Sequence, residues 1–206
     1  MRRSFSTLVL GGLLVALPAV AQADTTPEVQ KILDAKKTLN WNVARNGHAE
    51  RYGHAVTIVA ATSDKTKDTA VQYNRYKDFH RKFQSAKVIG KDGDNTDVYM
   101  KLSVKIGPMS VDQWAVMRFG PAKAQGNGVY VVEGKFEKGN MKDGNIVITM
   151  KPVDAKHTLL EVDMLMVPSL PAPTSMVEEE LRDGALDFAN GLKDTAQGWV
   201  GPVTQL

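Results

Sequence analysis

The sequence contains no cysteine, and this absence excludes several kinds of chemistry at once. Disulfide bonds cannot contribute to stability, even in an oxidising compartment that would permit them. Thiol nucleophiles are excluded, and so are zinc or iron–sulfur sites that depend on cysteine ligands. Any function of this chain must therefore be built from other side chains.

Motifs for metal binding and nucleophilic catalysis are also missing. The four histidines are His48, His54, His80 and His157, and none belongs to a His-x-x-x-His pair or a His-Glu-x-x-His segment. There is no Gly-x-Ser-x-Gly elbow and no phosphate-binding glycine loop. The acidic segment 91–97 lacks the downstream glutamate of a calcium loop and is predicted to be a hairpin turn. The sequence predicts no metal site and no cofactor.

Charge of either sign is nearly balanced. The chain has 26 lysines and arginines against 23 acids; residues 1–23 hold two of these arginines and no acid, so the remainder has 24 basic residues and a net charge of +1. Nucleic-acid binding needs a clustered basic face with interleaved aromatics, and only Tyr73–Lys82 comes near this pattern. We therefore predict no nucleic-acid partner. The alternatives for this segment are an ordinary helix face or a peripheral contact with anionic lipid.

Long apolar runs are limited to the N-terminus. Arg2 and Arg3 precede a short apolar run from Leu8 to Leu17, and Ala21-Gln22-Ala23 is a small-x-small cleavage pattern. These features are typical of a secretory signal peptide that is removed after Ala23. The run is short for a membrane anchor, which is the alternative. We expect an exported protein, either periplasmic or extracellular.

Apolar and polar residues alternate in the rest of the chain, in segments separated by turn sequences. A period of two predicts β-strands, and short turns between consecutive strands predict an antiparallel sheet. The strands are expected at 52–61, 86–90, 98–106, 111–119, 129–137, 146–150 and 158–167. One or two short helices are expected within 67–83, a loop at 120–128, and a short helix within 27–39 that Trp41 packs onto the body.

A long amphipathic helix follows the last strand. Ser175 and Glu178 have capping-box spacing, and Glu178–Glu180 place negative charge where the helix dipole favours it. A helix of about twenty-one residues would be about 31 Å long, enough to cross a sheet. Its apolar stripe consists of Val177, Leu181, Ala185, Phe188 and Leu192. We therefore predict an α+β fold in which a curved antiparallel sheet of about six or seven strands wraps around the C-terminal helix.

This order of elements resembles the START-related helix-grip (SRPBCC) superfamily, in the branch of polyketide cyclase/dehydrase-like and coenzyme Q-binding proteins. The resemblance is carried by the segment 72–79 (Gln-Tyr-Asn-Arg-Tyr-Lys-Asp-Phe), by the strands of 98–150, and by 167–171 (Val-Pro-Ser-Leu-Pro) before the helix. The family's usual acid is replaced by Gln72, and Arg81 stands where proline is frequent. The resemblance covers most of residues 50–196 and implies an apolar cavity between sheet and helix, which binds lipids, quinones or other hydrophobic ligands.

Methionines on the predicted strands are the main candidates for lining such a cavity, because their flexible side chains suit adaptable apolar surfaces. Ordinary core packing is the alternative for each of them. The candidate ligand-binding residues are Met100, Trp114, Met117, Phe136, Met150, Met164, Met166, Leu181 and Phe188. Asp112 and Glu133 are weak catalytic candidates, because a desolvated carboxylate could act as an acid or a base. The alternative for both is a solvated outer face.

Three functions remain open at this stage. The first is an exported protein that binds or carries a hydrophobic small molecule, and the second is a cyclase, dehydratase or hydrolase acting on such a molecule. The third is an interaction module without a cavity. The expected organisation is a signal peptide at 1–23, an N-terminal extension at 24–47, a START-like domain at 48–199 and a tail at 200–206. No feature of the sequence sets an oligomeric state.

Overall fold

The computed structural model describes residues 27–35, 37–45, 47–106 and 109–198. The signal peptide and the C-terminal tail expected from the sequence lie outside these residues. The helices are α1 (Pro27–Ala35), α2 (Ser63–Ala70), α3 (Tyr76–Phe79) and α4 (Thr174–Ala196), with a single turn of 3-10 helix, η1, at Tyr73–Arg75. The strands are β1 (Leu39–Val43), β2 (Tyr52–Val59), β3 (Phe83–Asp92), β4 (Asn95–Ile106), β5 (Met109–Phe119), β6 (Lys123–Gly126), β7 (Val129–Gly139), β8 (Met141–Pro152) and β9 (Thr158–Pro168).

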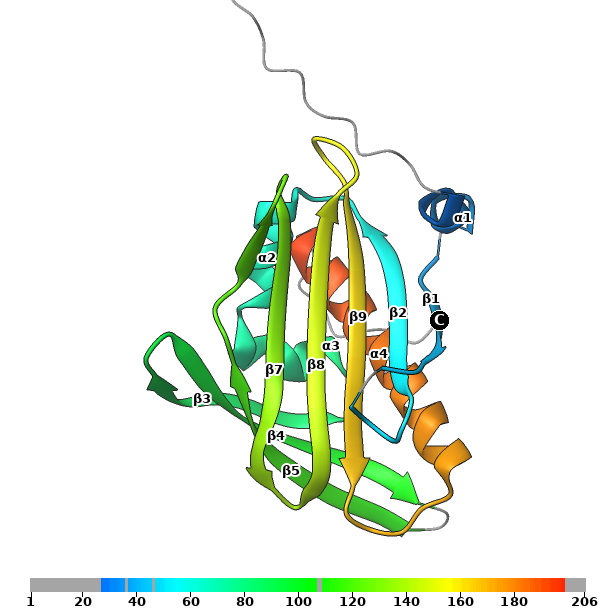
Figure 1. Cartoon of the computed structure of the whole chain (residues 1–206), viewed down its shortest axis with the longest axis vertical. Helices are drawn as coiled ribbons and strands as arrows, with labels where there is room; N and C mark the ends of the chain where they lie inside the picture. The colour runs from blue at the N-terminus through cyan, green and yellow to red at the C-terminus, as the bar shows by residue number, and fades with distance from the viewer. Residues whose placement is uncertain (1–26, 36, 46, 107–108, 199–206) are drawn as a thin grey trace, which may run out of the picture.

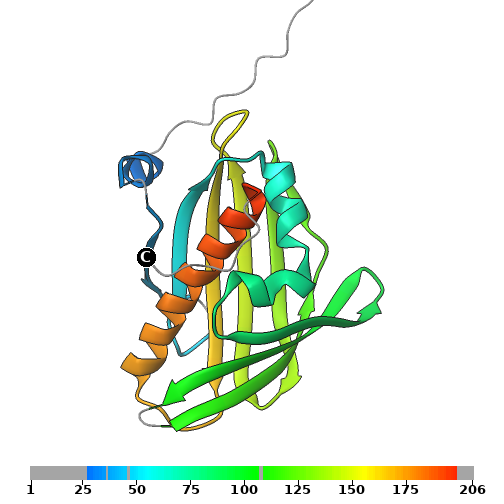
Figure 2. The ribbon, with the colours of Figure 1, turned by 180° about the vertical axis from the view of Figure 1, so that it is seen from behind.

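The strands form one antiparallel sheet in the order β1-β2-β9-β8-β7-β5-β4-β3, and β6 pairs with β7 beside this path. The sheet is strongly coiled: β3, β4 and β5 cross steeply below the upright strands β7, β8, β9 and β2 (Figure 1). Seen from behind, α4 runs diagonally over β2 and β9, with α2 and α3 beside its C-terminal half (Figure 2). The predicted α+β helix-grip fold is confirmed.

The described sheet has nine strands rather than the predicted six or seven. The additional strands are β1 and β6, which are short and lie where an N-terminal extension and a loop were expected. In β1 the polar residues have a structural task, because Asn42 donates a hydrogen bond to the carbonyl of Glu178 at 2.7 Å and Asn40 donates to that of Arg182 at 3.2 Å. This strand thus ties the sheet edge to α4.

The predicted stripe of α4 faces the sheet. Leu181, Ala185, Phe188 and Leu192 are buried, and Val177 packs against the same core. Two glycines allow the close approach: a Cβ on Gly53 would lie 1.8 Å from the Leu181 carbonyl oxygen, and one on Gly191 would lie 2.4 Å from the Phe79 Cα. The helix is therefore seated against β2 at one point and against α3 at another.

The start of α4 differs from the prediction. The helix begins at Thr174 with Pro173 as its N-cap residue, and no side chain caps it. Ser175 and Glu178 therefore do not form the predicted capping box, and no acidic residue lies in the first turn. The helix starts two residues earlier than predicted, because Pro173, with its fixed φ, takes the N-cap position expected for Ser175.

Aromatic rings fill the space between α3 and the second half of α4. Phe188 is fully buried and meets Tyr76 and Phe79 edge to face, with ring centroids 4.8 and 5.6 Å apart. Tyr76 donates a hydrogen bond to the Ala70 carbonyl at 2.8 Å, and Phe119 closes the cluster from β5. Because Tyr73 and Tyr76 are buried in this cluster, the Tyr73–Lys82 segment does not present interleaved aromatic and basic side chains to solvent.

Candidate ligand-binding site

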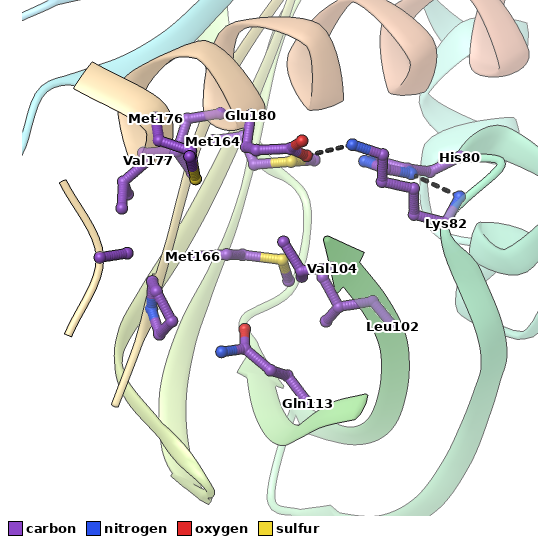
Figure 3. Close-up of a pocket in the computed structure, with 13 residues that line it drawn as sticks. His80, Lys82, Leu102, Val104, Gln113, Met164, Met166, Met176, Val177 and Glu180 are labelled. Carbon is purple, nitrogen blue, oxygen red and sulfur yellow. Dashed lines mark hydrogen bonds and ion pairs between the residues drawn. The ribbon is translucent and has the colours of Figure 1, made fainter. Parts of the chain in front are cut away.

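An apolar cavity lies between the first half of α4 and the inner face of the sheet (Figure 3). Its volume is about 50 Å³. The wall is built from the turn after α3, from β4, β5 and β9, from the segment that follows β9, and from α4. The lining residues are His80, Lys82, Leu102, Val104, Gln113, Met164, Met166, Pro168, Ala172, Met176, Val177, Glu180 and Leu181.

Most of the wall is apolar and adaptable. Residues 160, 162, 164 and 166 of β9 share the inner face of the sheet, so that Met164 and Met166 project toward the cavity. Met176 comes from the first turn of α4 (Figure 3). Three thioether side chains around one small space can change rotamer at low cost, which allows the wall to adapt to different shapes.

His80 supplies one polar group. Its ring is buried, stacks on Phe83 at a centroid distance of 4.6 Å, and accepts a hydrogen bond at Nδ1 from the backbone N–H of Lys82 at 3.1 Å. Burial, together with the neighbouring Lys82 and Arg81, lowers the pKa of His80 to about 3. The imidazole is therefore neutral at physiological pH, and its proton resides on Nε2.

Gln113 supplies the second polar group. Its side chain is only 1% exposed, and it lines the cavity from the inner face of β5. Within the described part of the chain its amide nitrogen, Nε2, has no hydrogen-bond partner. Buried polar atoms are rarely left unpaired, so this nitrogen stands out in a wall that is mostly apolar.

Gln113 was not predicted from the sequence, because the neighbouring Trp114 was expected on the inner face. β5 carries apolar residues on both faces, so alternation alone did not fix its phase. The structure places Gln113, Ala115 and Met117 inward, whereas Trp114 faces outward, is 37% exposed and stacks on Tyr99. The register of β5 against β4, which pairs Gln113 with Leu102, was the signal that would have identified it.

An ion pair between Lys82 and Glu180 borders the cavity and links the turn after α3 to α4 (Figure 3). These are the two charged side chains among the described residues that line the space. Because the two charges neutralise each other, the interior presents no net charge to a ligand.

The nine predicted ligand-binding residues are thus divided. Met164, Met166 and Leu181 line the cavity. The fully buried side chains that form the closed core instead are Met100, Met117, Met150 and Phe188. Phe136 is partly buried against this core, and Trp114 lies on the outer face, so neither borders the cavity.

The two weak catalytic candidates lie outside the cavity. Asp112 projects from the outer face of β5 beside Lys101, whose ammonium 2.7 Å away holds the pKa of the Asp112 carboxyl below its usual range. A carboxylate in that environment is a poor proton acceptor at neutral pH. Glu133 pairs with Lys135 at 3.2 Å. Neither side chain can reach a ligand held between the sheet and α4.

Glu133 borders a second hollow, on the outer face of the sheet, with a volume of about 480 Å³. Tyr52 and Asn145 share a buried hydrogen bond of 3.3 Å in this region. The ionisable side chains around the hollow are already paired with one another, as His48–Asp143 at 2.7 Å, Arg45–Asp163 at 2.8 Å and Glu133–Lys135 at 3.2 Å. It is an open polar depression, unlike the apolar space beneath α4.

Within the described ranges, no cluster of histidine and acidic side chains has the geometry of a metal site. None of the helices in this part of the chain combines the length and the apolar character needed to cross a bilayer.

Comparison with known proteins identifies solved structures that share this fold. No protein-family model matches the sequence, and no curated protein is significantly similar to it. Among solved structures, a STAR-related lipid transfer protein from Xanthomonas axonopodis matches with a TM-score of 0.65 at 14% identity, over 80% of this chain and 96% of that one.

Two further structures agree with this match. An aromatase/cyclase from a Streptomyces species has a TM-score of 0.57 at 13% identity, covering 71% of this chain and 93% of its own. A START superfamily protein from Mycobacterium smegmatis has a TM-score of 0.57 at 14% identity, covering 71% and 97%. The chain therefore has the START-like helix-grip fold.

Proposed function

We propose that this is an exported protein that binds or carries a hydrophobic small molecule, such as a lipid, a quinone or a polyketide-like compound, in the space between the sheet and α4. The observation that carries this proposal is the apolar cavity lined by Met164, Met166 and Met176 beneath the first half of α4. The names of the structural neighbours, a lipid transfer protein and an aromatase/cyclase, support a hydrophobic ligand.

Binding of such a ligand requires the cavity to widen. Its volume of about 50 Å³ is below the roughly 300–1,000 Å³ that is usual for ligand pockets. Two parts of the wall can move. The methionines can change rotamer, and the segment between the end of β9 at Pro168 and Ala172 belongs to no helix or strand. The second half of α4 is held more firmly, through Gly191 against α3 and through the aromatic cluster around Phe188.

The enzyme alternative has lost its candidates, since Asp112 and Glu133 lie outside the cavity.

Export rests on the N-terminal sequence, and cell fractionation tests it: the chain should appear, shortened by its first 23 residues, in the exported fraction. A full-length protein retained in the cytoplasm would contradict export.

Ligand binding is tested by native mass spectrometry of protein purified without detergent, with a hydrophobic fluorescent dye as a second probe. We expect a co-purifying mass, and dye binding that is lost in Met166→Trp, because the indole fills the cavity at the position of Met166. Ile89→Trp is the matched control, since Ile89 is 55% exposed on β3 and away from the cavity. A ligand-free mass together with no dye binding would refute the proposal.

A further inference from the structure

We propose that Gln113 is the polar anchor of this cavity and that its amide donates a hydrogen bond to a carbonyl oxygen of an uncharged, otherwise apolar ligand. The ligand class is thus a neutral carbonyl compound, such as an ester or a quinone, rather than a free fatty acid or a plain hydrocarbon. This inference rests on the proposed function and specifies which ligands the same cavity prefers.

The first argument is the unsatisfied donor. Gln113 is 1% exposed, and its Nε2 has no protein acceptor among the described residues, so its N–H groups are available to a group inside the cavity. A buried glutamine whose only role was packing could be replaced by an apolar residue that avoids the cost of burying a polar group. The amide also points into the cavity, below Met166 (Figure 3), where a ligand atom could reach it.

The second argument is the way the amide is held. Gln113 sits within β5, and its cross-strand neighbour on β4 is Leu102, which lines the same cavity. A side chain that projects from a paired strand is placed more precisely than one on a loop. The donor is therefore presented from a rigid wall, whereas the methionines opposite it supply the adaptable surface.

The third argument is electrostatic. The neutral His80 carries its proton on Nε2, so this ring also offers a donor and not a positive charge. The charges of Lys82 and Glu180 are used in their own ion pair. A carboxylate ligand would have to be desolvated without an unpaired cation among the described lining residues, whereas a neutral carbonyl avoids that cost and accepts the available hydrogen bond.

The test uses displacement of a hydrophobic dye from the chain lacking residues 1–23, by methyl palmitate, a short-chain ubiquinone, palmitate and heptadecane. The wild type should bind the carbonyl compounds roughly tenfold more tightly than heptadecane, the size expected for one buried hydrogen bond. The ester and the quinone separate a lipid from a quinone as the source of the carbonyl. Gln113→Leu should remove the preference while still binding heptadecane. Gln84→Leu, the same change at an exposed residue of β3 that does not line the cavity, should keep it.

A second measurement remains informative even if Gln113→Leu does not fold. In a nitrogen-edited NMR spectrum of the wild type, selectively labelled on glutamine side chains, one amide pair should shift with methyl palmitate and not with heptadecane. An unchanged preference in Gln113→Leu, no shifted amide pair, or a preference of the wild type for palmitate would overturn the anchor. Equal binding of all four compounds would still support a ligand-binding cavity but would refute the role of Gln113 as its anchor. If none of them bound, the proposed function would be refuted as well.

Discussion

Replacing Phe188 by alanine tests whether this residue of α4 belongs to the hydrophobic core or to the ligand-binding cavity. Phe188 is fully buried, meets Tyr76 and Phe79 edge to face, and does not line the cavity. A buried Phe→Ala change costs about 3–5 kcal/mol. Each edge-to-face contact adds about 0.5–1.5 kcal/mol beyond buried area, so we expect a loss in the upper half of that range, about 4–5 kcal/mol.

Urea unfolding followed by tryptophan fluorescence measures this loss, provided that the m-value is unchanged. For a domain of this size the melting temperature should fall by about 8–20 °C. Leu170→Ala is the control, because Leu170 is 47% exposed between β9 and α4 and should change the free energy of unfolding by no more than about 0.5 kcal/mol. Dye binding at temperatures where Phe188→Ala is folded should be unchanged.

The reasoning would be refuted by a Phe188→Ala protein that loses less than about 2 kcal/mol, well short of the cost expected for a rigid core site. Such a result, together with altered dye binding, would mean that Phe188 faces a yielding space and belongs to the ligand cavity. The sequence alone left both roles open for this residue, and the ring contacts to Tyr76 and Phe79 now favour the core.

Two further predictions concern the seating of α4 and the buried histidine. Gly191→Ala should destabilise the protein despite the gain of about 1 kcal/mol in helix propensity, because the new Cβ would clash with backbone atoms of Phe79. The control is Gly90→Ala, where the new Cβ enters open space and the free energy of unfolding in the same urea assay should not change. The free energy of unfolding of the wild type should fall by up to about 1.4 kcal/mol per pH unit as the pH drops from 6.5 to 5. In this range His80 takes up a proton in the unfolded chain, whereas in the folded protein its pKa of about 3 keeps it neutral. His80→Gln should flatten this slope, and equal slopes in both proteins would contradict a buried neutral His80.

The sequence predicted those elements whose pattern is set by one buried face. β4, β7 and β9 alternate clearly, and the stripe on α4 has helical spacing, so both their type and their phase could be predicted. Short polar strands such as β1 could not, because Asn40 and Asn42 are in place to bind carbonyls of α4 rather than to fill a core. β5 was found but its phase was wrong, since it is apolar on both faces.

The cavity was harder to predict than the fold because its wall is assembled from distant segments. His80 and Lys82 come from the turn after α3, Gln113 from β5, and Glu180 from α4. The methionine pattern identified Met164 and Met166, but it could not separate them from the methionines on β4, β5 and β8 that the coiled sheet places in the closed core. That separation depends on where the sheet coils away from the helix, which is a property of the whole fold.

The position of the cavity follows from the way α4 is seated. Phe188 and its aromatic neighbours pack beneath the second half of the helix, and Gly191 lets the helix touch α3, so the contacts there are close. Beneath the first half the opposing strands β4 and β5 supply smaller or flexible side chains, and the cavity opens between them and β9. We therefore predict that stability depends mainly on the second half of α4, and ligand choice on the cavity wall beneath its first half. Substitutions at Met166 on β9 or Gln113 on β5 should then change which ligand is preferred without disturbing the aromatic cluster that holds the helix in place.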